Sequence, residues 1–307
     1  MHPALTAAIA GVFGLLIGSF VNVVVWRVPR HESVVRPGSH CPTCSTPIAW
    51  FDNVPVVSWI VRRGRCRHCR GRISIRYPLV EVATGVAFAI VGWRFAGDIV
   101  VVPMLVLTGC LVALCAIDID HLLLPNRVLY PSAAMVVPLF VLAAGVDDAW
   151  SSLGRAALGA VVSFAVFYAL WFVAPGAMGF GDVRLVTLLG FAAAYFGWST
   201  LVAALVAPFV FGAIGGIAVA APVVLAPMAA AAIVGWVTGV SVMTRIAGGV
   251  TDTPARARAT VAVTFSVLVG SIVYLVLSAL GRVERGRHIP FGPYLALGAL
   301  AAMLVHG

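Results

Sequence analysis

The stretch ALTAAIAGVFGLLIGSFVNVVVW, residues 4–26, is followed at once by Arg27 and by a polar segment of about fifty residues. An uninterrupted apolar run of this length is what a membrane-spanning helix needs, and no basic region precedes it as in a signal peptide. We therefore expect an uncleaved membrane anchor. The basic residues that follow predict that the N-terminus lies outside and that residue 27 onward lies in the cytoplasm.

The composition extends this prediction to the whole chain. The 307 residues are 62% hydrophobic and 10% charged, and the mean hydropathy is +1.06, which excludes a soluble globular protein. The formal net charge is +9, and half of the 20 arginines lie between Arg27 and Arg76. This clustering favours cytoplasmic orientation and contact with the lipid bilayer, so we expect no nucleic-acid partner.

Apolar runs recur along the chain and are separated by short polar breaks. We predict an all-α polytopic membrane protein with about ten transmembrane helices and a small cytoplasmic domain after the first. The expected segments are a first transmembrane helix at 1–26, a cytoplasmic domain at 27–77, a transmembrane core at 78–220, extra helices and loops at 221–288, and a closing transmembrane helix at 289–307.

Four of the six cysteines follow the pattern C-x2-C, x21, C-x2-C: Cys41, Cys44, Cys66 and Cys69. This spacing predicts a four-thiolate Zn²⁺ site. A closed set of four protein ligands leaves no position for water, so we expect a structural metal rather than a catalytic one. Two disulfides are the alternative, and the predicted cytoplasmic location disfavours them.

Two acids interrupt the apolar runs at the expected cytoplasmic face. Asp118 ends the third run, and Asp182 closes the motif Gly179-Phe180-Gly181-Asp182. Either acid alone could cap the following helix. Together they suit a pair of carboxylates that share one proton and activate water against a peptide bond, which is aspartyl protease chemistry. Glycines in the motif would let the backbone approach an extended substrate.

Three further polar residues leave alternatives open. Asp120 could take the place of Asp118, orient it, or be a solvated loop residue. Glu81 is either a favourable acid in the first turn of a helix or a functional group. Asn22, inside the first apolar run, is expected to form an interhelical hydrogen bond.

Several motifs resemble those of one family, the type IV prepilin peptidases, which are intramembrane aspartyl proteases with a GxGD signature. Besides Gly179–Asp182, the similar stretches are GSFVNV at 18–23 with Arg27 and Pro29, the segment 41–69 with DNVP at 52–55, RYPLVE at 76–81, DIDHLLLPN at 118–126 and IPFGPYLA at 289–296.

The resemblance implies that Asp118 and Asp182 are the catalytic acids and that Asp120 is not. Gly179, Phe180, Gly181 and Asp120 would then support the catalytic loop. The family core has eight helices, so the resemblance implies about two extra helices within 221–288.

The resemblance also implies a substrate and a location. Pilin or pseudopilin precursors would lose a short basic leader at the cytoplasmic face of the bacterial inner membrane. Many members also methylate the new N-terminus with S-adenosylmethionine, and Glu81 with the zinc domain would be the region for that activity. The alternatives are a carboxylate-dependent membrane transporter and a non-catalytic zinc-anchored scaffold, although a zinc-binding loop and a GxGD motif are not expected of a transporter.

Overall fold

The computed structural model describes residues 2–41, 43–173, 178–208 and 292–306. Within these residues the regular structure is helical, apart from two isolated β-bridges, which confirms the all-α prediction. The chain forms two compact units. The first comprises Met1–Gly154 with Gly179–Leu185, and the second comprises Arg155–Met178 with Val186–Gly307.

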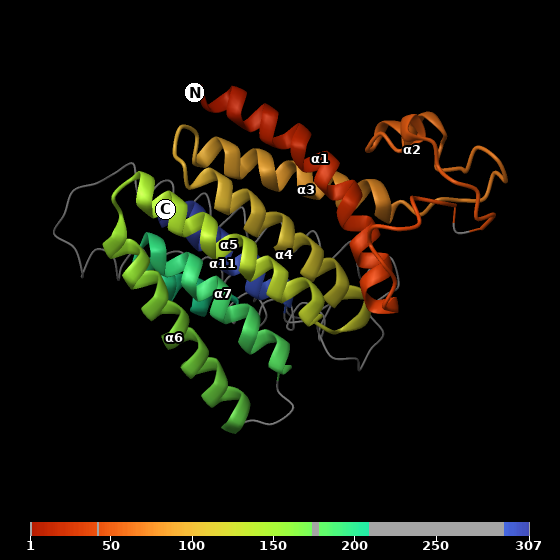
Figure 1. Cartoon of the computed structure of the whole chain (residues 1–307). Helices are drawn as coiled ribbons and strands as arrows, with labels where there is room; N and C mark the ends of the chain where they lie inside the picture. The colour runs from red at the N-terminus through yellow and green to blue at the C-terminus, as the bar shows by residue number, and fades with distance from the viewer. Residues whose placement is uncertain (1, 42, 174–177, 209–291, 307) are drawn as a thin grey trace, which may run out of the picture. The chain divides into compact units, whose positions relative to one another are not determined.

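The first unit contains the long helices α1, α3, α4 and α5 (Figure 1). Their bounds are Pro3–Arg27, Arg76–Arg94, Val101–His121 and Asn126–Val146. The polar segment between α1 and α3 carries only short helices, namely η1 at Val28–Arg30, η2 at Trp50–Asp52 and α2 at Val57–Val61.

The second unit contains most of α6, Trp150–Val173, and of α7, Phe180–Phe196. The helix Trp198–Pro208 and α11, Gly292–His306, complete its described part. The Arg155 guanidinium donates to the carbonyl oxygens of Ala194 and Tyr195, both at 2.7 Å. This side chain therefore ties the first half of α6 to the end of α7.

Four of the described helices are long and apolar enough to cross a membrane, namely α1 with η1, α4, α5 and α6. This agrees with a membrane protein. The extra helices predicted at 221–288 lie outside the described residues, as does the start of the closing motif at 289–291.

Glycines allow α1 and α3 to pack in direct backbone contact. A Cβ atom on Gly14 would lie 2.7 Å from the Cβ of Phe88 and 2.8 Å from the carbonyl oxygen of Thr84. A Cβ on Gly18 would lie 2.7 Å from the Cα of Glu81. Small residues at such positions are what allow helices to approach closely inside a membrane, where van der Waals packing takes the place of the hydrophobic effect.

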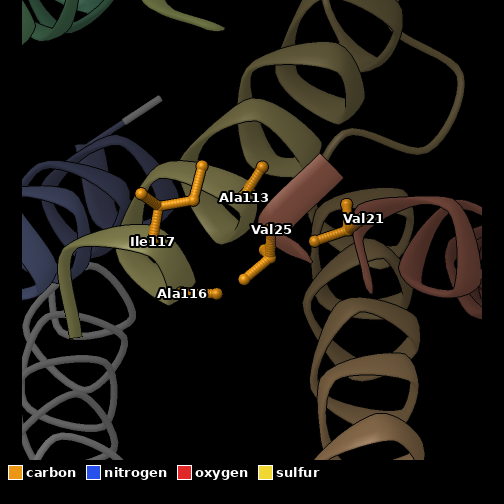
Figure 2. Packing of buried hydrophobic residues seen from close by; sticks show 5 residues of the cluster. All are labelled: Val21, Val25, Ala113, Ala116 and Ile117. Atoms are coloured by element: carbon orange, nitrogen blue, oxygen red, sulfur yellow. The ribbon is translucent and has the colours of Figure 1, made fainter. Parts of the chain in front are cut away.

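A buried apolar cluster joins α1 to α4 (Figure 2). It comprises Val21 and Val25 of α1 and Ala113, Ala116 and Ile117 of α4. Ile117 is fully buried and directly precedes Asp118. The cluster thus fixes the last turns of α4, where the first predicted catalytic acid lies.

We predict that Gly14→Ala lowers the free energy of unfolding by about 1–3 kcal/mol, because the new methyl group overpacks the contact with α3. Thermal unfolding in detergent measures the effect. Gly154→Ala in α6 is the matched control, because nothing lies within 4 Å of a Cβ at that position. Equal unfolding temperatures for the two variants would contradict the proposed contact.

Candidate active site

Asp118 lies in the last turn of α4 and is only 6% exposed. The helix ends at His121 because Leu122 adopts the left-handed conformation, with φ at 52°. The N–H of Leu122 donates to the carbonyl oxygen of Asp118 at 2.8 Å, which is a helix-terminating hydrogen bond. The backbone that carries this carboxylate is therefore fixed both by its own C-cap and by the α1–α4 cluster.

Asp120 forms an ion pair with Arg76 of α3. The Nη2 atom of Arg76 lies 2.5 Å from Asp120 Oδ2 and 3.3 Å from the carbonyl oxygen of Ala116. One guanidinium thus joins the first turn of α3 to the last turns of α4. Because the Asp120 side chain is 13% exposed and paired, Asp120 is not a solvated loop residue.

Asp182 occupies the third position of α7 and is 8% exposed. Its Oδ2 accepts a hydrogen bond from the N–H of Gly179 at 3.0 Å, and its own N–H donates to the Gly179 carbonyl oxygen at 3.1 Å. An acid at this position that reaches back to the residue before the helix is half of a capping box. The capping role expected of Asp182 is therefore present, and it holds the carboxylate in place.

The segments that carry the two acids pack against each other within the first unit. A Cβ atom on Gly181 would lie 3.0 Å from the Cβ of Leu124, which follows the end of α4. Arg184 Nη1 donates to Asn126 Oδ1 at 2.6 Å, and its guanidinium lies 4.5 Å from the ring centroid of Phe180. Two buried aspartates, far apart in the sequence, therefore lie on contacting segments.

The four predicted metal ligands converge. The Sγ atoms of Cys41, Cys44, Cys66 and Cys69 all lie within 4.8 Å of one another. Cys41 and Cys69 are 3.8 Å apart at sulfur, and tetrahedral coordination with Zn–S bonds of about 2.3 Å places sulfurs about 3.8 Å apart. All six cysteines are unpaired, so the disulfide alternative is not what the structure forms. The set fits a metal ion.

The two CxxC pairs lie in turns that have the same backbone hydrogen bond and the same left-handed position. The N–H of Cys41 donates to the Thr46 carbonyl oxygen at 3.0 Å, and the N–H of Cys66 donates to the Gly71 carbonyl oxygen at 2.9 Å. The residue after each second cysteine, Ser45 and Arg70, has a φ of 57°. Because neither residue is glycine, the sequence carried no signal for these left-handed positions.

Hydrogen bonds favour the thiolate form at two of the cysteines. The Thr46 side chain, whose Oγ1 lies 3.3 Å from Cys44 Sγ, lowers the pKa of Cys44 to about 6, and the Thr46 backbone acts in the same direction. Backbone hydrogen bonds from Cys69 and His68 lower the pKa of Cys66. Since the thiolate is the metal ligand, these contacts favour coordination at Cys44 and Cys66. At Cys69, burial and the neighbouring thiols raise the pKa to about 11.

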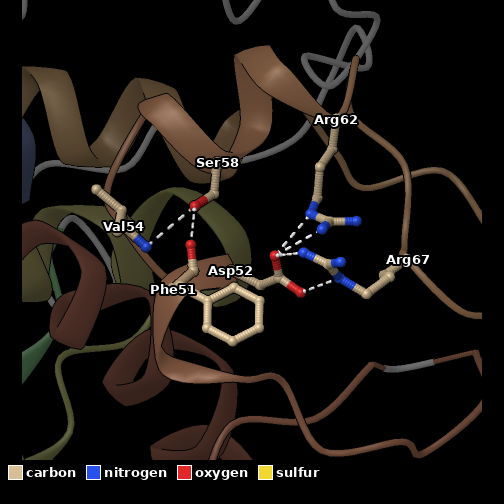
Figure 3. Close-up of polar contacts among 6 residues, drawn as sticks. All are labelled: Phe51, Asp52, Val54, Ser58, Arg62 and Arg67. Atoms are coloured by element: carbon tan, nitrogen blue, oxygen red, sulfur yellow. Dashed lines mark hydrogen bonds and ion pairs between the residues drawn. The ribbon is translucent and has the colours of Figure 1, made fainter.

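Asp52 joins two arginines of the segment between α1 and α3 (Figure 3). Its Oδ1 lies 2.6 Å from Arg62 Nη2, and its Oδ2 lies 2.7 Å from Arg67 Nε. The hydrogen bond from Arg67 is the main cause that holds the pKa of Asp52 below its usual range. Arg67 lies beside Cys66, so this pairing links η2 to the second CxxC turn. From the sequence, Asp52 was visible only as part of a motif.

Glu81 and Asn22 lie where α1 and α3 meet. Glu81 is in the second turn of α3, so the interpretation as a first-turn acid is wrong. It is 8% exposed, and its Oε2 accepts from the N–H of Val56 at 2.7 Å. Asn22 Nδ2 donates to the Tyr77 carbonyl oxygen at 3.1 Å, which confirms the expected interhelical hydrogen bond.

Comparisons with known proteins show the family to which the chain belongs. The family described as "Bacterial Peptidase A24 N-terminal domain" matches residues 12–95, and the family described as "Type IV leader peptidase family" matches residues 105–217. A "Prepilin leader peptidase/N-methyltransferase" of Stutzerimonas stutzeri is 33% identical over 99% of this chain and 92% of its own length. The chain belongs to the type IV leader peptidase family.

Other members of the family match over shorter stretches. A "Prepilin leader peptidase/N-methyltransferase" of Myxococcus xanthus is 41% identical over 67% of this chain and 61% of its own length. A "Type 4 prepilin-like proteins leader peptide-processing enzyme" of Escherichia coli is 37% identical over 62% of this chain and 77% of its own length. No solved structure matches the chain.

We expect Asp52→Asn to increase the rate of tryptic cleavage within residues 27–77 several-fold. The variant keeps the shape of the side chain but removes the charge that both arginines contact, and charge-assisted hydrogen bonds are roughly twice as strong as neutral ones. Limited proteolysis of the purified protein gives the rates. Glu32→Gln is the control, because Glu32 is an exposed acid of the same segment. A digestion rate equal to that of the control would argue against the pairing.

Proposed function

We propose that this chain is a membrane-embedded aspartyl peptidase that removes the leader peptide of type IV prepilin-like precursors. The observation that carries the proposal is the contact between the Gly181 and Leu124 segments, which brings two buried aspartates to one region of the first unit. The names of the relatives supply the substrate class, pilin or pseudopilin precursors.

In this mechanism Asp118 and Asp182 work as a pair. Neighbouring carboxylates do not ionise together easily, so one is ionised while the other holds a proton. The ionised acid accepts a proton from water as the water attacks the scissile carbonyl carbon. The protonated acid then gives its proton to the leaving amine, and the peptide bond breaks.

The GxGD turn would receive the substrate backbone. Gly179 is exposed, and the nearest atom that a Cβ there would meet is Asp182 Oδ2, at 3.5 Å. A side chain at this position would therefore stand beside the carboxylate and obstruct an extended peptide. Without one, the substrate backbone can approach the acid closely.

The topology proposed from the sequence places this chemistry in the cytoplasm. We propose a multi-pass protein of the bacterial inner membrane with about ten spans, a first span at 1–26 and a closing span at 289–307. The segment 27–77 would be a cytoplasmic domain, 78–220 the catalytic core and 221–288 an extra pair of helices. The arginines between Arg27 and Arg76 support this orientation under the positive-inside rule.

Two bound groups belong to the proposal. Cys41, Cys44, Cys66 and Cys69 would hold a structural Zn²⁺, since four thiolates leave no open coordination position. The relatives named as N-methyltransferases support a second activity, methylation of the new N-terminal amine with S-adenosylmethionine as the methyl donor.

We predict that Asp118→Asn and Asp182→Asn each reduce leader cleavage by about 10²- to 10⁴-fold, which is the usual contribution of a general acid or base. The assay follows the mobility shift of a prepilin on incubation with the protein in proteoliposomes. Asp147→Asn is the matched control, because Asp147 is exposed at the end of α5. Full cleavage by either catalytic variant would rule out the pair.

Loss of the metal is expected to open the cytoplasmic domain without removing cleavage, because the ligands and the two aspartates lie on different segments. For Cys44→Ser we predict a metal affinity lowered by at least about tenfold, faster proteolysis within 27–77 and retained cleavage of prepilin. Elemental analysis and limited proteolysis measure the first two effects, with Cys110→Ser in α4 as the control. If the metal is instead essential for cleavage in a protein whose fold stays intact, this division of roles is wrong.

A further inference from the structure

The short helix α2 presents two different sides. The side chains of Ser58 and Trp59 each donate to a backbone carbonyl oxygen of the segment between α1 and α3, both at 3.1 Å, and both line a cavity of about 500 Å³ there. The other three residues of α2 are apolar, exposed and absent from the cavity lining: Val57, Ile60 and Val61. Since residues three and four apart share one side of a helix, these three form a continuous apolar surface.

A pair of aromatic residues adds to the exposed apolar area. Trp50 is 83% exposed, and its ring lies edge-on against the ring of Phe51, with the centroids 5.7 Å apart. The Ser58 hydroxyl of α2 donates to the Phe51 carbonyl oxygen, which ties this pair to α2 (Figure 3). Exposed apolar side chains gathered on a polar segment mark a surface that binds a protein or a membrane. Tryptophan is enriched where membrane meets water, because its ring is apolar and its N–H is polar.

The charge around this surface is positive. Residues 27–77 contain ten arginines and only two acids, and one of these acids, Asp52, is already paired with two of the arginines. Arg63 directly follows α2 and is exposed, and no carboxylate of the described residues forms an ion pair with it. Four thiolates around a Zn²⁺ would add a net charge of only about −2. The segment therefore keeps a positive surplus that an anionic surface would attract.

Both ends of the segment start from the same end of the α1–α3 pair. The Arg30 guanidinium lies 3.7 Å from the ring centroid of Trp26, and its Nη1 donates to the Trp26 carbonyl oxygen at 2.6 Å. Tryptophan and arginine together at the end of an apolar helix are typical of the headgroup level of a membrane. The hydrogen bond from Asn22 to the Tyr77 carbonyl oxygen places the entry to α3 beside this end of α1. A membrane surface is thus a partner at high effective concentration for the whole segment.

We propose that the apolar surface of α2, continued by Arg63, docks on anionic lipid headgroups of the membrane in which the long helices lie. The three aliphatic side chains enter the boundary between headgroups and acyl chains, as the apolar faces of interfacial helices do. Arg63 pairs with lipid phosphate, which the guanidinium fork can contact through two hydrogen bonds. Trp50 lies at the same headgroup level. The docking holds the segment between α1 and α3 against the membrane, and it is independent of both the peptidase and the metal.

The test uses the full-length protein in proteoliposomes, with the photo-crosslinking residue p-benzoylphenylalanine in place of Val61. The vesicles contain phosphatidylcholine alone or phosphatidylcholine mixed with phosphatidylglycerol, so only the headgroup charge differs. Mass spectrometry after irradiation identifies the attached molecule as lipid or protein. The same label in place of Ile48, which lines the cavity, is the control position. Arg63→Gln removes the charge and Arg63→Lys keeps it, and Arg36→Gln is the matched control because Arg36 is another exposed arginine of the segment.

We expect lipid adducts at position 61 but not at position 48, with a yield at least about fivefold higher when phosphatidylglycerol is present. In those vesicles Arg63→Gln should lower the yield by about fivefold, because one arginine near an anionic surface contributes about that factor to membrane affinity. Arg63→Lys and Arg36→Gln should keep the yield.

The comparison of the two lipid mixtures uses one and the same protein, so it decides even where an arginine variant does not fold. Equal yields in both mixtures would overturn the proposal, as would the absence of lipid adducts at position 61. Crosslinks from this position to a second copy of the chain, or to an added prepilin, in place of lipid would assign the surface to a protein partner and refute the docking on lipid.

Discussion

The contact between α1 and α3 is the constraint on which both candidate sites depend. Two helices whose backbones touch are stabilised by close van der Waals packing at small residues. Gly14 and Gly18 provide that packing by leaving room for Phe88, Thr84 and Glu81. Because the two helices touch at their backbones, the chain leaving α1 at Arg27 and the chain entering α3 at Arg76 are held together.

Because of this contact, the segment between α1 and α3 is held at both of its ends. Arg27 is buried and donates to the carbonyl oxygens of Ser33 and Gly38 at 3.0 and 3.1 Å, and Asn22 bonds across to Tyr77. Arg76 then extends the same anchor to Asp120 and the end of α4. The segment that carries the four clustered cysteines and the end of the helix that carries Asp118 are therefore joined through the first turn of α3.

The sequence predicted those features that follow from periodicity and spacing. The apolar runs identified the long helices among the described residues, the CxxC spacing identified the four cysteines that converge, and the polar breaks identified the segments of Asp118 and Asp182. Features that depend on tertiary contact were not predictable. The partner of Asp120 is Arg76, more than forty positions away, and the strained turn at Val56 places a positive φ on a residue type that rarely adopts one. Glu81 was noticed, but its burial without a cation could not be read from its neighbours in the chain.

The buried carboxylates Asp182 and Glu81 are held by different kinds of contact. The proposed peptidase chemistry needs an acid and a base together, and a pair of carboxylates meets that need when the two share one proton. Asp182 accepts a hydrogen bond from the backbone of its own turn. Glu81 instead accepts one from the N–H of Val56, a residue of another segment whose backbone is strained. Because the two carboxylates lie on separate helices, the hydrogen bonds around one can change without altering those around the other.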